Sequence, residues 1–103
     1  MENPLIITVT LGSYINKHCI YLPSEKPVQD PRDLKIKFYL RSIRQYPRND
    51  TQIYINNKYF FVLNTPLREE TKESISNIIR YCYMYGLSIE EIKTEFKKAY
   101  GRA

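Results

Sequence analysis

Lysine and arginine side chains are concentrated in one short segment, residues 35–48, with the sequence KIKFYLRSIRQYPR. The segment has five positive charges and no negative ones. Arginine can bind a phosphate through two hydrogen bonds at once, and lysine binds it as a point charge. Cations repeated along one surface suit the regularly spaced phosphates of a nucleic acid. The candidate nucleic-acid-binding residues are Lys35, Lys37, Arg41, Arg44, Arg48 and Lys58.

The net charge of the chain lies in the same region. From Arg32 to Lys58 there are seven basic and two acidic residues, so this quarter of the chain has a charge of +5. The whole chain, with 16 basic and 11 acidic residues, also has a net charge of +5. Such asymmetry predicts an anionic partner, DNA or RNA. The alternative is the ordinary solvated Lys/Arg face of a protein with no such partner.

Tyrosine is also abundant, with ten copies in 103 residues. Four of them are in or near the basic segment and would stack on bases if exposed. These four are Tyr39, Tyr46, Tyr54 and Tyr59.

A second group of tyrosines, Tyr81, Tyr83 and Tyr85, occupies positions i, i+2 and i+4 of one expected helix. These positions cannot all face one core, and tyrosine is enriched in protein interfaces. They are the candidate protein interface. The alternative function is therefore a protein-interaction or inhibitory accessory module, of the kind that viruses and mobile elements encode, acting as a homodimer.

Side chains for enzyme chemistry are sparse. His18 is the single histidine, so a pair of histidines for acid–base catalysis or metal binding is excluded within one chain. Glutamates cluster at 69–73 and 90–95, in the first turns of expected helices, where acids stabilise the helix dipole. The three glycines form no phosphate-binding loop. We therefore expect a non-enzymatic protein with no metal, cofactor or small-molecule substrate.

Length and composition are typical of one small folded domain, residues 1–103, because 43% of the residues are hydrophobic. Apolar runs are too short to cross a bilayer, and no signal peptide is evident, so we expect a cytoplasmic protein with no membrane partner. Cys19 and Cys82 are expected to be small buried side chains, with a disulfide between them as the alternative.

Two hairpins are expected. The β-branched residues of 4–11 and the apolar run 18–22 predict the first. Apolar runs on either side of Asn56-Asn57 predict the second, with a type I′ turn, because asparagine tolerates positive φ. In that register Ile53 pairs with Phe60 and Tyr54 pairs with Tyr59.

Residues 33–46 are ambiguous. Apolar residues alternate with polar ones from Leu34 to Arg41, as in a half-buried strand. Asp30-Pro31, however, is a good helix start, and apolar residues also recur at helical spacing. We favour the helix, which would place Lys37, Arg41 and Arg44 together on its solvent face, opposite Tyr39; the strand remains the alternative.

The last third predicts two helices. The first begins at Thr65-Pro66 and ends at Gly86, with Ile75, Ile78, Ile79 and Cys82 on its buried stripe. The second has Ser88 as N-cap and Glu91 completing a capping box, and it buries Ile89, Ile92, Phe96 and Ala99 or Tyr100. The expected fold is α+β, an antiparallel sheet of about four strands in two hairpins with helices packed on one side, in the order ββαββαα.

Overall fold

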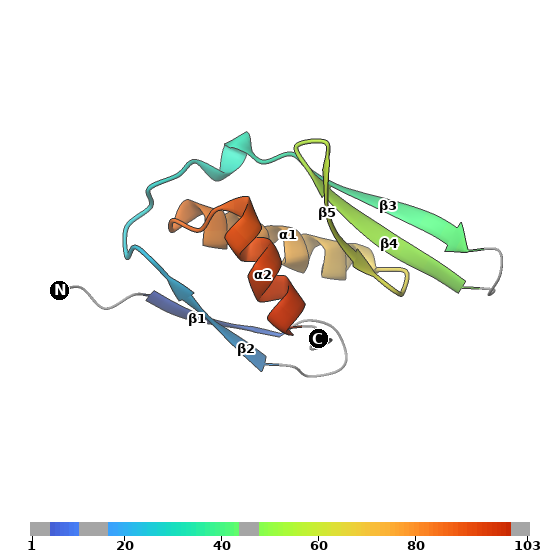
Figure 1. Cartoon of the computed structure of the whole chain (residues 1–103), viewed down its shortest axis with the longest axis horizontal. Coiled ribbons are helices and arrows are strands. Elements are labelled where there is room, and N and C mark those ends of the chain that lie inside the picture. The colour runs from blue at the N-terminus through green and yellow to red at the C-terminus, as the bar shows by residue number, and fades with distance from the viewer. Residues whose placement is uncertain (1–4, 11–16, 44–47, 100–103) are drawn as a thin grey trace. The chain divides into compact units, whose positions relative to one another are not determined.

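The computed structural model describes residues 5–10, 17–43 and 48–99 (Figure 1). Two small antiparallel sheets and two helices make up the described residues, which confirms the α+β class. Five strands are present there rather than four. The chain divides into two compact units, Met1–Pro31 with Asn77–Ala103, and Arg32–Ser76.

The first unit contains a two-stranded sheet, β1 (Leu5–Thr10) and β2 (Lys17–Leu22). The strands pair antiparallel as predicted, from Leu5↔Leu22 to Thr10↔Lys17. Alternation gives the sheet two different faces. Ile20 and Leu22 are buried, whereas Ile6 and Tyr21, which pair with each other, are exposed.

Helix α1 (Glu69–Met84) begins four residues after Thr65, and the boundary between the two units falls within it. Its predicted stripe is buried at Ile75, Ile79 and Cys82, and half-buried at Ile78. The helix ends as predicted at Gly86, whose φ is 111°. The Gly86 N–H donates to the carbonyl of Tyr83 and the Leu87 N–H donates to that of Cys82, each at 3.1 Å. This pair of bonds is a Schellman motif, which requires positive φ at the glycine position.

Helix α2 (Ile89–Ala99) begins with the predicted capping box. The Ser88 N–H donates to Glu91 Oε1 at 2.9 Å, and the Glu91 N–H donates to Ser88 Oγ at 3.2 Å. One stripe of α2 (Ile92, Phe96 and Ala99) is buried, and the helix contacts β2 in the first unit. Ile89, which the sequence predicts to be buried, is half-buried, and Tyr100 lies outside the described residues.

The capping box predicts a pH dependence of stability. Hydrogen bonds from Ser88 lower the pKa of Glu91 below 4.5 in the folded protein. Because the folded pKa is the lower one, this stabilisation is complete above about pH 4.5 and is lost as the pH falls through the folded pKa. Glu91→Gln removes the titrating carboxyl group and should therefore remove this pH dependence of the stability. Urea unfolding at pH 7 and pH 3 should show a smaller stability loss for this variant than for the wild type; equal losses would contradict the prediction.

The second unit contains a three-stranded sheet in the order β3-β4-β5, made of β3 (Ile36–Ile43), β4 (Arg48–Ile55) and β5 (Lys58–Leu63). The helix favoured for residues 33–46 is therefore wrong. Pro31 starts only a single 3₁₀ turn, η1 (Pro31–Asp33). From Ile36 onward each residue of β3 has a partner in β4, so long-range pairing overrides the local helix start. Residues 44–47 lie outside the described part of the chain.

The turn between β4 and β5 has the predicted geometry, with φ of 52° at Asn56 and 67° at Asn57. Asn56 also joins the turn to β3. Its N–H donates to the Lys35 carbonyl, and its Oδ1 accepts the Lys35 N–H, both at 2.8 Å.

The predicted register of this hairpin is correct at its turn and wrong beyond it. Tyr54 pairs with Tyr59, but Ile53 pairs with Phe61 rather than Phe60, because a β-bulge intervenes. Phe60 falls between the two pairs and is buried. Beyond the bulge, Leu63 pairs with Thr51, and both are buried.

Candidate nucleic-acid interface

One face of the β3-β4-β5 sheet brings together most of the described candidates. Alternation along β3 places Lys37, Tyr39 and Arg41 on the same side. Their partners across β4 are Tyr54, Gln52 and Asp50, and Tyr59 of β5 pairs with Tyr54. We call this surface the tyrosine face; its members are Lys37, Tyr39, Arg41, Asp50, Gln52, Tyr54 and Tyr59. The neighbouring β4 residues Ile53 and Ile55 are buried.

Three tyrosine rings form a connected row on this face. The ring centroids of Tyr39 and Tyr54 are 5.3 Å apart with planes at 89°, and those of Tyr54 and Tyr59 are 6.0 Å apart with planes at 82°. Such edge-to-face contacts are favourable and fix the ring orientations. The central Tyr54 is half-buried, whereas Tyr39 and Tyr59 are each 47% exposed. Tyr46, the fourth predicted stacking residue, lies outside the described residues.

The hydroxyl of Tyr59 stays neutral at physiological pH. Burial, followed by the neighbouring Tyr54 and Asp50, raises the pKa of Tyr59 above 10, while Arg41 opposes the shift. The ring therefore adds no negative charge to the tyrosine face.

Three lysines near this face are exposed to solvent: Lys35, Lys37 and Lys58. Lys37 is opposite Tyr54 in the register. Lys35 precedes it by two residues and lies just before β3, where its backbone hydrogen-bonds to Asn56. Lys58 pairs with Ile55 and so belongs to the opposite side by alternation, at the end of the sheet where Lys35 contacts Asn56. The lysines therefore gather at the Asn56-Asn57 end.

Arg41 differs from the lysines because it is joined to a buried carboxylate. Its Nε donates to Asp50 Oδ1 at 3.2 Å and its Nη2 donates to Oδ2 at 2.8 Å. The Asp50 side chain is only 3% exposed, whereas that of Arg41 is 56% exposed. The hydrogen bond to Asp50, with its charge, raises the pKa of Arg41 further. The positive charge of Arg41 is therefore offset by Asp50 and is not freely available to a phosphate. No pattern in the sequence indicates this pairing.

The side chains of the other two candidate arginines lie outside the part of the chain that the structure describes. Arg44 lies outside the described residues, and Arg48 begins β4 in register with Ile43. The expected helical stripe of Lys37, Arg41 and Arg44 does not form, because residues 36–43 are a strand. The strand instead places Tyr39 between Lys37 and Arg41.

The candidate protein interface, Tyr81, Tyr83 and Tyr85, is half-buried at all three positions. The rings of Tyr81 and Tyr85 contact each other, with centroids 4.7 Å apart. Gln29 Nε2 donates to the Tyr83 carbonyl at 2.6 Å, and the Ser24 N–H donates to the Tyr85 carbonyl at 3.2 Å. The backbone carbonyls at this end of α1 are therefore already hydrogen-bonded within the chain. The homodimer stays a prediction, since the structure describes one chain.

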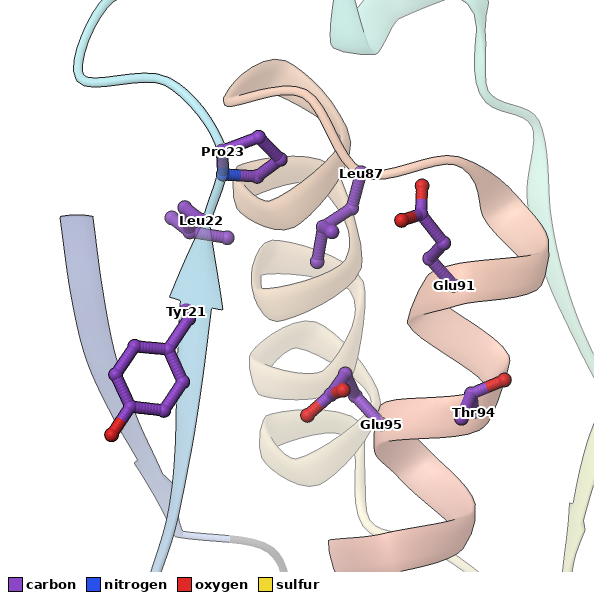
Figure 2. Close-up of a pocket in the computed structure, with 7 residues that line it drawn as sticks. All are labelled: Tyr21, Leu22, Pro23, Leu87, Glu91, Thr94 and Glu95. Carbon is purple, nitrogen blue, oxygen red and sulfur yellow. The ribbon is translucent and has the colours of Figure 1, made fainter. Parts of the chain in front are cut away.

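A pocket of about 470 Å³ in the first unit was not predicted (Figure 2). Its lining comes from the end of β2, the turn before α2, and α2: Tyr21, Leu22, Pro23, Leu87, Glu91, Thr94 and Glu95. Both carboxylates already have structural partners. Glu95 Oε1 is 2.8 Å from His18 Nε2, and Glu91 belongs to the capping box. No sequence signal joins residues 77 positions apart, as His18 and Glu95 are.

The two cysteines are free thiols, so the disulfide alternative is wrong. Cys82 is buried as expected, whereas Cys19 is exposed. Burial raises the pKa of the Cys82 thiol to about 12. Only thiolates react quickly with alkylating reagents. At pH 8, iodoacetamide should therefore modify Cys19 in the native protein and both thiols in urea; mass spectrometry of digested peptides would show this, and rapid native labelling of Cys82 would contradict it.

The described ranges contain neither a cluster of metal-ligating side chains nor a helix that could span a membrane. No three His, Cys, Asp or Glu side chains gather there as a metal site would require. Neither described helix is both long and apolar enough to cross a membrane.

The arrangement available for binding is therefore a row of tyrosine rings on a sheet, flanked by exposed lysines. Comparisons with protein-family models, with curated proteins and with solved structures find nothing that matches this chain.

Proposed function

We propose that this protein is a non-enzymatic nucleic-acid-binding protein and that the tyrosine face, with the lysines beside it, is its binding surface. The observation that supports this most directly is the position of exposed Lys37 on the same side of β3 as exposed Tyr39, with exposed Lys35 immediately before the strand. Lysines supply charge for phosphates, and tyrosine rings supply flat apolar surface for bases. A nucleic acid presents both groups along one strand.

The charge distribution sets the expected strength of the electrostatic part. Asp50 offsets the charge of Arg41, and Lys58 lies on the opposite side of the sheet, so the cations on or beside the tyrosine face whose side chains are described are Lys37 and, just before β3, Lys35. Two phosphate contacts predict that log K falls against log salt concentration with a slope of about −1.5 to −2. Binding of this kind selects sequence weakly, because phosphates are the same at every base.

The test is fluorescence anisotropy with labelled DNA and RNA, single- and double-stranded, over a salt series. Lys35→Glu with Lys37→Glu should lower affinity at least tenfold and make the salt slope smaller by about 2. The matched control is Lys26→Glu with Lys97→Glu, which changes the net charge equally at two exposed lysines of the first unit.

Equal losses in the two double variants would show that only net charge matters, and would overturn the proposed site. Absence of binding at low salt would overturn the function itself. The interface alternative, through Tyr81, Tyr83 and Tyr85, would then be tested by measuring the mass of the protein in solution at several concentrations.

A further inference from the structure

The tyrosine face displays ring surface in an ordered arrangement. Tyr54 is half-buried at the centre and makes an edge-to-face contact with a ring on each side. Tyr39 and Tyr59 each keep 47% of their surface exposed. Large exposed rings cost solvation free energy in a protein that has no ligand for them. Their fixed orientation also means that a ligand would lose little rotamer entropy on meeting them.

We infer, on the basis of the proposed function, that the ligand is a single-stranded nucleic acid and that one base stacks on Tyr39 and another on Tyr59. In a duplex the base faces are already stacked on each other and only base edges are accessible in the grooves. In a single strand the faces are free, and aromatic side chains bind them with little regard to base identity. Exposed rings on a sheet therefore favour single strands over duplexes.

The lysines are placed to hold the backbone of such a strand. Lys37 pairs with Tyr54, the central tyrosine, whose ring contacts both exposed rings. Lys35 lies two residues before Lys37 in the chain. Phosphates alternate with bases along a strand, so bases on Tyr39 and Tyr59 would bring phosphates near these ammonium groups. A protein partner would gain from the rings but would have to supply acidic groups at the same spacing.

Tyr54 is a positioning residue in this arrangement. Its ring contacts both stacking rings and is itself less exposed than either. Replacing it with phenylalanine keeps the edge-to-face contacts. This variant therefore keeps the two stacking rings in position.

The experiment compares affinities of each variant for a labelled ten-nucleotide single strand and for the matching duplex. Tyr39→Ala and Tyr59→Ala should each weaken single-strand binding by about 5- to 100-fold and leave duplex binding within twofold. Tyr39→Phe and Tyr59→Phe should keep single-strand affinity, because a phenyl ring also stacks. The control is Tyr21→Ala, which removes a tyrosine that is 64% exposed on the other sheet and should change neither affinity.

The outcomes separate this inference from the proposed function. If the alanine variants bind single strands as tightly as the wild type, while the lysine variants do not, stacking is overturned and phosphate binding stands. If the alanine substitutions lower the affinities for the single strand and for the duplex equally, the preference for single strands is overturned. Loss of affinity in the phenylalanine variants would also overturn stacking, because it would show that the hydroxyl groups bind the ligand. The alanine variants are compared with the wild type at a temperature at which thermal unfolding shows them folded.

Discussion

Exchanging Arg41 for glutamate is expected to unfold the β3-β4-β5 sheet, and not merely to weaken binding. Asp50 is in register with Arg41, is 2% exposed and accepts two hydrogen bonds from the guanidinium. The substitution removes both bonds and puts a second negative charge opposite a buried one. Breaking an ion pair whose carboxylate is buried is costlier than losing a pair that is exposed at both partners, because the remaining charge stays desolvated.

The measurement is urea unfolding followed by circular dichroism at pH 7. The matched control is Lys37→Glu, which makes the same charge change two residues away on the same strand, where the register partner is Tyr54. This control should unfold near the wild-type midpoint, whereas Arg41→Glu should unfold at far lower urea or be unfolded in buffer. Equal midpoints would show that the sheet tolerates the buried Asp50 carboxylate without the Arg41 guanidinium.

Replacing Phe96 with alanine is expected to have the second large effect, in the first unit. Phe96 is 1% exposed on the stripe of α2 that also buries Ile92 and Ala99. Truncating a buried phenylalanine costs about 3–5 kcal/mol, through lost burial and the cavity left behind. Because small proteins are stable by only about 5–15 kcal/mol, the variant should be close to unfolding at 37 °C.

Thermal and urea unfolding of Phe96→Ala would measure this loss. Lys97→Ala is the neighbouring control, since Lys97 is exposed on the same helix and its truncation should cost less than about 0.5 kcal/mol. A loss below 1 kcal/mol for Phe96→Ala would contradict the packing of α2 described above.

Features governed by neighbouring residues could be predicted from the sequence. The turn at Asn56-Asn57, the helix end at Gly86 and the capping box of Ser88 with Glu91 all depend on a few adjacent residues. Their geometry follows from φ preferences and unpaired backbone groups, and it is the same in many folds.

Features governed by distant residues could not be predicted. The segment from Leu34 to Arg41 is compatible with both helix and strand, and pairing with β4 decides between them. This choice changes the candidate site, since a helix would separate Tyr39 from Lys37 and Arg41, whereas the strand unites them. The Arg41–Asp50 pair requires the register of that pairing, and the His18–Glu95 contact joins β2 to α2.

The bulge at Phe60 has a consequence for how the length of β5 can vary. Tyr59 and Leu63 are four positions apart, and in a regular strand an even separation puts two side chains on the same face. Here Tyr59 is 47% exposed, while Leu63 is 7% exposed in register with the buried Thr51. Deleting Phe60 would remove the bulge and leave Leu63 opposite Thr51 in a regular ladder, but it would also remove a side chain that is only 1% exposed. A one-residue deletion in this strand should therefore preserve the pairing and still destabilise the sheet, because it removes part of the core.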